Sequence, residues 1–124
     1  MNIVDSSGWL EYFAEGENAD FFAPAIEDTL NLVVPVISVY EVFRRLLRSH
    51  GLDVAETRIA DLFKGTQVDL TASLAMSAAQ LSVEHGLPMA DSLILATARA
   101  HDATLWTQDE YFKDLPGVKY IEKK

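Results

Sequence analysis

The chain has 124 residues, 49% of them hydrophobic, and no cysteine, which permits one core-forming domain and excludes thiol nucleophiles, cysteine-ligated metal sites and disulfides. The first residues, MNIVDSSGWL, lack the basic region and long apolar stretch expected of a secretory leader, and no apolar run approaches the roughly 20 residues that a membrane helix needs. We therefore expect a single domain over residues 1–124, located in the cytoplasm. The net charge of -9 disfavours binding to phosphate backbones unless the acidic groups hold cations or a basic partner is present.

Strands and helices are expected to alternate along the chain. Short apolar runs predict buried parallel strands at Asn2–Val4, Leu32–Val36, Gln67–Asp69, Thr104–Thr107 and Val118–Ile121. Helical spacing predicts helices at residues 7–15, 19–28, 38–50, 54–64, 71–85 and 89–101. This pattern is typical of an α/β fold, in which a central parallel sheet is covered by helices on both faces. Sites in such folds form beyond the carboxyl ends of the strands.

Helix boundaries are marked by capping residues. A basic or imidazole side chain followed by glycine predicts helix ends at His50-Gly51, Lys64-Gly65 and His85-Gly86. A hydroxyl or aspartate followed three residues later by glutamate predicts helix starts at Ser38 with Glu41, Asp53 with Glu56, and Thr107 with Glu110.

Two acidic residues follow strands directly. Asp5 comes after the apolar pair Ile3-Val4, and Asp109 follows the strand ending at Thr107. Both are therefore expected at the same edge of the sheet. Helix capping is the alternative interpretation, because aspartate is stabilised near a helix N-terminus, although Glu110 suits the capping interpretation better than Asp109 does.

Asp91 is the acid that local structure explains least. Leu95 and Ala98 lie one and two turns further along the same helix, so the carboxylate projects from an apolar, inward face. A carboxylate removed from water needs a partner or a metal ion. We therefore favour a functional role for Asp91.

Glu41 is the most ambiguous acid. Its spacing from Ser38 is that of a capping box, and Arg45 four residues later suits a surface ion pair. Its place in the first turn of a helix that follows the second strand nevertheless directs it to the same crevice.

Four carboxylates at one sheet edge would repel one another without cations. Magnesium or manganese is the expected occupant, because these ions bind through a few carboxylates, water and phosphate. Such a site supports phosphodiester hydrolysis. Hydroxyls that could hold the acids or water belong to Ser6, Ser7, Ser38 and Thr107, although helix capping explains them equally well.

Other candidate groups are weaker. The histidines His50, His85 and His101 fall at helix ends and are expected to be solvated. Arg44, Arg45 and Arg48 form the one basic cluster, which is either a solvated helix face or a contact to RNA phosphates. The aromatic residues Trp9, Tyr12, Phe13, Phe21 and Phe22 are expected in the core or a subunit interface.

The chain resembles PIN-domain ribonucleases, and in particular the VapC-type toxins of VapBC toxin–antitoxin pairs. The resemblance covers nearly the whole chain and rests on the order and spacing of four segments: residues 3–7 (IVDSS), 38–42 (SVYEV), 87–94 (LPMADSLI) and 104–109 (TLWTQD).

The resemblance implies an α/β/α sandwich that binds Mg²⁺ or Mn²⁺, cleaves RNA, forms a homodimer and is silenced by an antitoxin with a basic C-terminal segment. It assigns catalytic and metal-binding roles to Asp5, Glu41, Asp91 and Asp109, and a supporting role to Thr107. Some relatives carry an acidic or imidazole residue two places after the fourth acid, where this chain has Tyr111.

Two alternatives belong to other functional classes. One is a non-catalytic RNA- or protein-binding module that uses the acidic crevice to dock basic side chains. The other is a phosphatase or phosphoacceptor, which the sequence disfavours because no second aspartate stands two positions after Asp5 and no lysine follows the strand that ends at Thr107.

Overall fold

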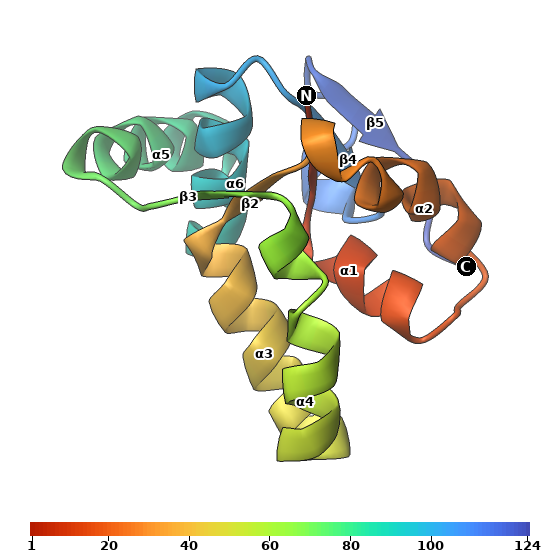
Figure 1. Ribbon diagram of the computed structural model, residues 1–124. Coiled ribbons are helices and arrows are strands. Elements are labelled where there is room, and N and C mark those ends of the chain that lie inside the picture. The colour runs from red at the N-terminus through yellow and green to blue at the C-terminus, as the bar shows by residue number, and fades with distance from the viewer.

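The computed structural model describes residues 1–124 and contains five short parallel strands. Figure 1 shows how the strands and helices are arranged. The strands are β1 (Asn2–Val4), β2 (Val33–Pro35), β3 (Thr66–Val68), β4 (Thr104–Thr107) and β5 (Val118–Tyr120). β4 lies between β1 and β5, β2 pairs with β3, and a bridge from Asn2 to Leu32 joins the two groups. The strand order across the molecule is therefore β3-β2-β1-β4-β5.

Six α-helices connect the strands, with three single turns of 3₁₀ helix. The α-helices are α1 (Ser6–Phe13), α2 (Ala19–Glu27), α3 (Val36–His50), α4 (Leu52–Ile59), α5 (Ala72–His85) and α6 (Met89–Ala100). The 3₁₀ turns are η1 (Thr29–Asn31), η2 (Leu62–Lys64) and η3 (Glu110–Phe112). Figure 1 shows α3 and α4 running side by side away from the strands. None of the helices combines the length and apolar character that a membrane crossing requires.

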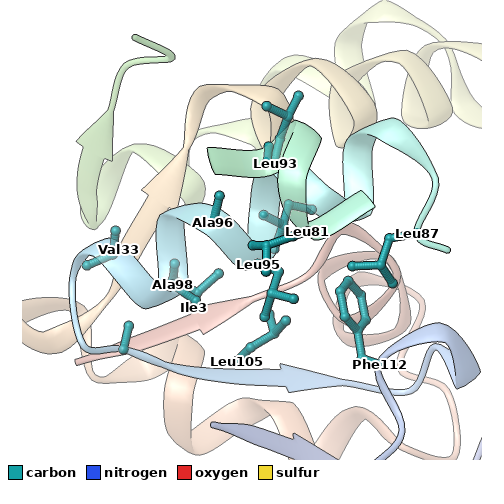
Figure 2. Packing of buried hydrophobic residues seen from close by; sticks show 13 residues of the cluster. Ile3, Val33, Leu81, Leu87, Leu93, Leu95, Ala96, Ala98, Leu105 and Phe112 are labelled. Carbon is teal, nitrogen blue, oxygen red and sulfur yellow. The ribbon is translucent and has the colours of Figure 1, made fainter. Parts of the chain in front are cut away.

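Alternate residues of the strands enter two separate cores. Ile3 and Val33 pack with α5 and α6, whereas their neighbours Val4 and Val34 pack with α1 to α4. Figure 2 shows the first core, in which Leu105 of β4 also lies among side chains of α6. This alternation follows from the two-residue period of a strand. The predicted α/β/α sandwich with a parallel sheet is thus confirmed.

Three expected helix boundaries are wrong. α3 begins at Val36, so Ser38 lies inside the first turn and its side chain is fully buried instead of capping the helix. α4 begins at Leu52, so Asp53 does not cap it either. The helix expected over residues 54–64 divides into α4 and η2, and the tighter second turn holds Leu62 fully buried in the core.

The glycine signals mark real ends. Gly51 and Gly86 follow α3 and α5 with φ of 86° and 68°, values that favour glycine because it lacks a Cβ. Gly65 ends η2 with a negative φ of -85°, so there the residue marks the end of a 3₁₀ turn without needing the left-handed conformation.

The strand order reverses at β1. From β1 the chain moves outward to β2 and β3, then returns to β4 on the other side of β1. Such a reversal opens a crevice between the carboxyl ends of the two strands that flank it. The residues that follow β1 and β4 therefore meet in this crevice.

Candidate active site

Asp5 lies at the end of β1, where the chain turns into α1. Its carboxylate is 2% exposed and accepts hydrogen bonds from the Gly8 amide (2.9 Å) and the Thr107 hydroxyl (2.6 Å). The Ser7 hydroxyl lies 3.0 and 3.1 Å from the two carboxylate oxygens. Burial raises the pKa of Asp5 to about 6, although these hydrogen bonds lower it. The capping interpretation of Asp5 is confirmed, but capping does not require a carboxylate to be buried this deeply.

Thr107 links Asp5 to Asp109. Its fully buried hydroxyl donates to Asp5 and accepts from the Asp109 amide at 2.9 Å. The carboxylate of Asp109 in turn accepts from the Tyr111 amide at 3.0 Å and caps η3. The expected box of Thr107 and Glu110 is therefore wrong, because the threonine hydroxyl is turned inward to Asp5 and the aspartate takes the capping role.

Asp91 projects inward from the first turn of α6. Leu95 and Ala98 are buried, which confirms the predicted apolar face, and Asp91 itself is only partly exposed. Its pKa is raised to about 7, first by burial, then by Asp109, and further by the charges of Asp5 and Glu41. Each of the other three acids thus acts on this one carboxyl group.

Glu41 faces α1. Its Oε1 accepts a hydrogen bond of 2.5 Å from the hydroxyl of Ser6, and Ser6 is the first residue of α1. No ion pair to Arg45 is formed, and Ser38 is no capping partner. Both structural alternatives considered for Glu41 are therefore wrong, and its carboxylate is held beside the crevice by a residue adjacent to Asp5.

The four acids have no cationic side chain as a partner. The ion pairs of the protein are Lys64–Asp61 and His85–Glu84, and neither involves these acids. No three acidic or histidine side chains are arranged to hold a metal ion directly. The donor set nevertheless fits Mg²⁺ or Mn²⁺, which bind through one or two carboxylates and complete their shells with water and substrate oxygens.

The hydroxyl residues expected to support the acids behave differently from one another. Ser6 and Thr107 donate to Glu41 and Asp5, as described. Ser38 donates to no protein group, although its side chain is fully buried and its hydroxyl has no hydrogen-bond partner. A buried hydroxyl without a partner costs stability, so local structure does not explain Ser38.

A polar pair that the sequence did not reveal supports the loop carrying Asp109. The Asn18 side chain is 1% exposed, and its amide donates to Gln108 Oε1 at 2.9 Å and to the Glu122 carbonyl at 3.1 Å. The sequence could have pointed to Gln108, because this residue lies between the candidate residues Thr107 and Asp109. Asn18 carries no such signal, because its two partners are 90 and 104 residues away.

The remaining candidates lie outside the acidic group. His50 and His101 are exposed and His85 is partly exposed, each at a helix end. Three of the five N-terminal aromatic side chains are buried, which confirms their core role: Trp9, Phe13 and Phe22. Arg44 and Arg45 are exposed on α3, in the turn that follows Glu41.

Comparison with known proteins agrees with this architecture. A family model described as PIN domain matches residues 3–118, while no curated protein matches significantly. A toxin–antitoxin complex from Klebsiella pneumoniae contains a chain that is 25% identical, with 96% of each chain covered and a TM-score of 0.79. DNA-bound VapBC from Salmonella typhimurium is 14% identical over 98% of each chain, with a TM-score of 0.74. VapC20 from Mycobacterium tuberculosis, described as a toxin that cleaves the sarcin–ricin loop, is 18% identical over 89% of this chain and 91% of that chain, with a TM-score of 0.73.

Proposed function

The chain belongs to the PIN domain family, and on that premise we propose that it is a metal-dependent endoribonuclease and the toxin of a toxin–antitoxin pair. The proposed catalytic and metal-binding acids are Asp5, Glu41, Asp91 and Asp109. The observation that carries the proposal is the group formed by these carboxylates. Burial and the other three acids raise the pKa of Asp91, and none of the four acids forms an ion pair, which is a costly arrangement unless a cation binds there.

The side chains of the proposed site have different roles. Asp5 is fixed by its hydrogen bonds to Thr107 and Gly8, so its carboxylate orientation is set before substrate arrives. Asp91 has its pKa raised to about 7 in the metal-free protein, so a cation bound there would compete with a proton near neutral pH. A bound Mg²⁺ or Mn²⁺ would lower the pKa of a water molecule and neutralise charge on the phosphate. The acids would then orient that water for attack on phosphorus.

The partners follow from charge and from the similar complexes. A net charge of -9 favours association with a basic chain, and two of the similar structures described above are toxin–antitoxin complexes. We therefore propose RNA as the substrate and an antitoxin with a basic C-terminal segment as the inhibitor. A homodimer and a cytoplasmic location remain predictions from the resemblance and the composition.

The proposal predicts RNA cleavage that needs Mg²⁺ or Mn²⁺ and stops on addition of a chelator. Asp91→Asn and Asp5→Asn should each lower the cleavage rate by about 100-fold or more, the range in which a positioned acid–base group contributes. The measurement is the initial rate of cleavage of a labelled RNA at a series of ion concentrations. Circular dichroism of each variant establishes that it is folded.

Asp53→Asn is the matched control, because Asp53 is an exposed aspartate in the first turn of α4, away from the crevice. It should cleave at the wild-type rate. Equal cleavage by Asp91→Asn and the wild type would contradict the assignment of the site. Tight, metal-independent binding of a basic peptide without RNA turnover in any divalent ion would instead support the non-catalytic module.

A further inference from the structure

A cleft opens beside Glu41. Its volume is about 460 Å³, within the range of ligand-binding pockets, and it lies between α1 and α3. The residues that line it are Ser6 and Leu10 of α1 with Tyr40, Glu41, Arg44 and Arg45 of α3. Ser6 and Glu41 belong to the proposed active site, so the cleft is continuous with that site.

Tyr40 is the unusual residue of this cleft. Its side chain is 63% exposed, although tyrosine normally covers much of its apolar ring. It makes no hydrogen bond and no aromatic contact within the protein. Both the ring and the hydroxyl are therefore available to a ligand.

Arg44 and Arg45 supply positive charge one helical turn beyond Tyr40 and Glu41. Neither forms an ion pair, even though the chain carries 19 acidic residues. Arg45 follows Glu41 by four residues of α3, which is about 6 Å along the helix axis. Unpaired guanidinium groups in a net acidic protein favour an anionic occupant, and they disfavour the basic segment of an antitoxin.

We infer that this cleft binds an unpaired nucleotide next to the scissile phosphate, with its base stacked on Tyr40 and its phosphate held by Arg44 and Arg45. The inference rests on the proposed function and adds to it a nucleotide-binding subsite formed by Tyr40, Arg44 and Arg45. Bases become available for stacking on aromatic side chains in single strands, loops and bulges, whereas bases in a duplex remain stacked on one another. Tyr40 can therefore stack only on a base that is not paired.

The test compares cleavage of a short unpaired RNA strand with cleavage of the same strand annealed to its complement. Tyr40→Ala should raise KM for the unpaired strand by about 5- to 100-fold, because losing a base-stacking aromatic costs about 1–3 kcal/mol and 1.4 kcal/mol is tenfold. kcat should stay within about twofold, because Tyr40 binds substrate and carries no proton. Tyr40→Phe should behave as the wild type, since it keeps the aromatic face.

Phe63→Ala is the matched control. Phe63 is an aromatic residue of similar exposure, 56%, on η2 and outside the cleft, so its loss should leave KM unchanged. Arg44→Gln with Arg45→Gln should weaken binding and reduce the salt dependence of KM by roughly the slope expected for two phosphate contacts. Thermal unfolding of each variant separates folding defects from binding defects.

The outcomes separate this inference from the proposed function. Wild-type protein that cleaves no RNA in any divalent ion would overturn the proposed function. Cleavage with an unchanged KM in Tyr40→Ala, or full recovery in Tyr40→Leu, which keeps apolar area but no aromatic face, would overturn the stacking subsite alone. Tyr40→Ala that loses affinity for a basic antitoxin peptide but keeps its KM for RNA would show that the cleft belongs to the protein partner.

Discussion

Asp5 and Asp91 are held in surroundings that favour their protonated forms. Their pKa values rise from 3.8 to about 6 and about 7, with burial as the largest cause in each. An acid whose pKa is raised on folding binds more protons in the folded state than in the unfolded state between the two values. The stability that such an acid contributes through proton binding is fully present below pH 3.8, its pKa in the unfolded state. This stability is lost as the pH rises through the pKa of the folded state. The metal-free protein should therefore lose stability between about pH 4 and pH 8 through these two groups.

Asp91→Asn should remove the part of this pH-dependent loss of stability that is due to Asp91. In the presence of a chelator, the variant should be more stable than the wild type at pH 8 by about 1–2 kcal/mol, a value that allows for solvent screening of a partly exposed group. The difference should shrink towards zero near pH 4, where the wild-type carboxyl is already protonated. Urea unfolding at the two pH values measures it.

Asp53→Asn again serves as the control, because Asp53 is exposed and lies outside the crevice. It should show little difference from the wild type at either pH. A stability gain for Asp91→Asn that is the same at pH 4 and pH 8 would rule out charge repulsion as its cause.

At the scale of elements, α1 is positioned by close contact as well as by its cap. Gly8 lies in the first turn of α1, and a Cβ added there would come within 2.7 Å of both Phe22 on α2 and Val4 on β1. Phe22 and Val4 are at most 1% exposed, so neither can move aside easily. The absence of a side chain at Gly8 therefore allows α1 to lie close to β1 and keeps Ser6 and Ser7 beside the crevice.

Gly8→Ala should destabilise the protein even though alanine is the better helix former. The helix gains about 0.5–1 kcal/mol from the substitution, whereas overpacking a dense core costs about 1–3 kcal/mol, so the net loss should be about 1–2 kcal/mol. Ser77→Ala, at an exposed position of α5, should instead raise stability slightly. Thermal unfolding of the two variants gives the comparison, and a more stable Gly8→Ala would show that α1 can shift without strain.

At the scale of the whole molecule, the strand reversal at β1 gathers acids from both ends of the chain. Asp5 and Thr107 are 102 residues apart, yet they share a hydrogen bond of 2.6 Å. Bringing the four acids together costs electrostatic energy that the folded core must offset. A cation that binds only the folded state would stabilise it and so offset part of this electrostatic cost.

Mg²⁺ should therefore raise the unfolding temperature more than NaCl does at equal ionic strength. A concentration 100-fold above the dissociation constant stabilises by about 2.7 kcal/mol, and each kcal/mol shifts the midpoint by about 2–8 °C in a domain of this size class. Asp5→Asn should lose most of the Mg²⁺ effect and keep the NaCl effect. Equal shifts with the two salts would indicate general screening instead of a bound ion.

The local periodicities of the sequence determined the alternating strands and helices, the α/β/α class and the inward face of α6. These predictions are correct because the helical and strand periods depend only on residues close together in the sequence. Parallel strands are also buried on both faces, so they appear in the sequence as short apolar runs. Strand-end position also predicted correctly that Asp5 and Asp109 lie at the same edge of the sheet. Helix starts were less predictable, since Ser38, Asp53 and Thr107 have the residue types of caps but are placed elsewhere by packing.

Only the tertiary structure decided how the acids are held. The hydroxyl of Thr107 turns to Asp5, Glu41 pairs with Ser6, and Asn18 reaches Gln108 across 90 residues. Such contacts depend on strand order, register and the angle between helices, none of which is encoded in a short stretch of sequence. Asp91, the acid best supported by the sequence, owes its inward direction to local spacing, but its pKa of about 7 comes first from burial and then from three acids of distant segments.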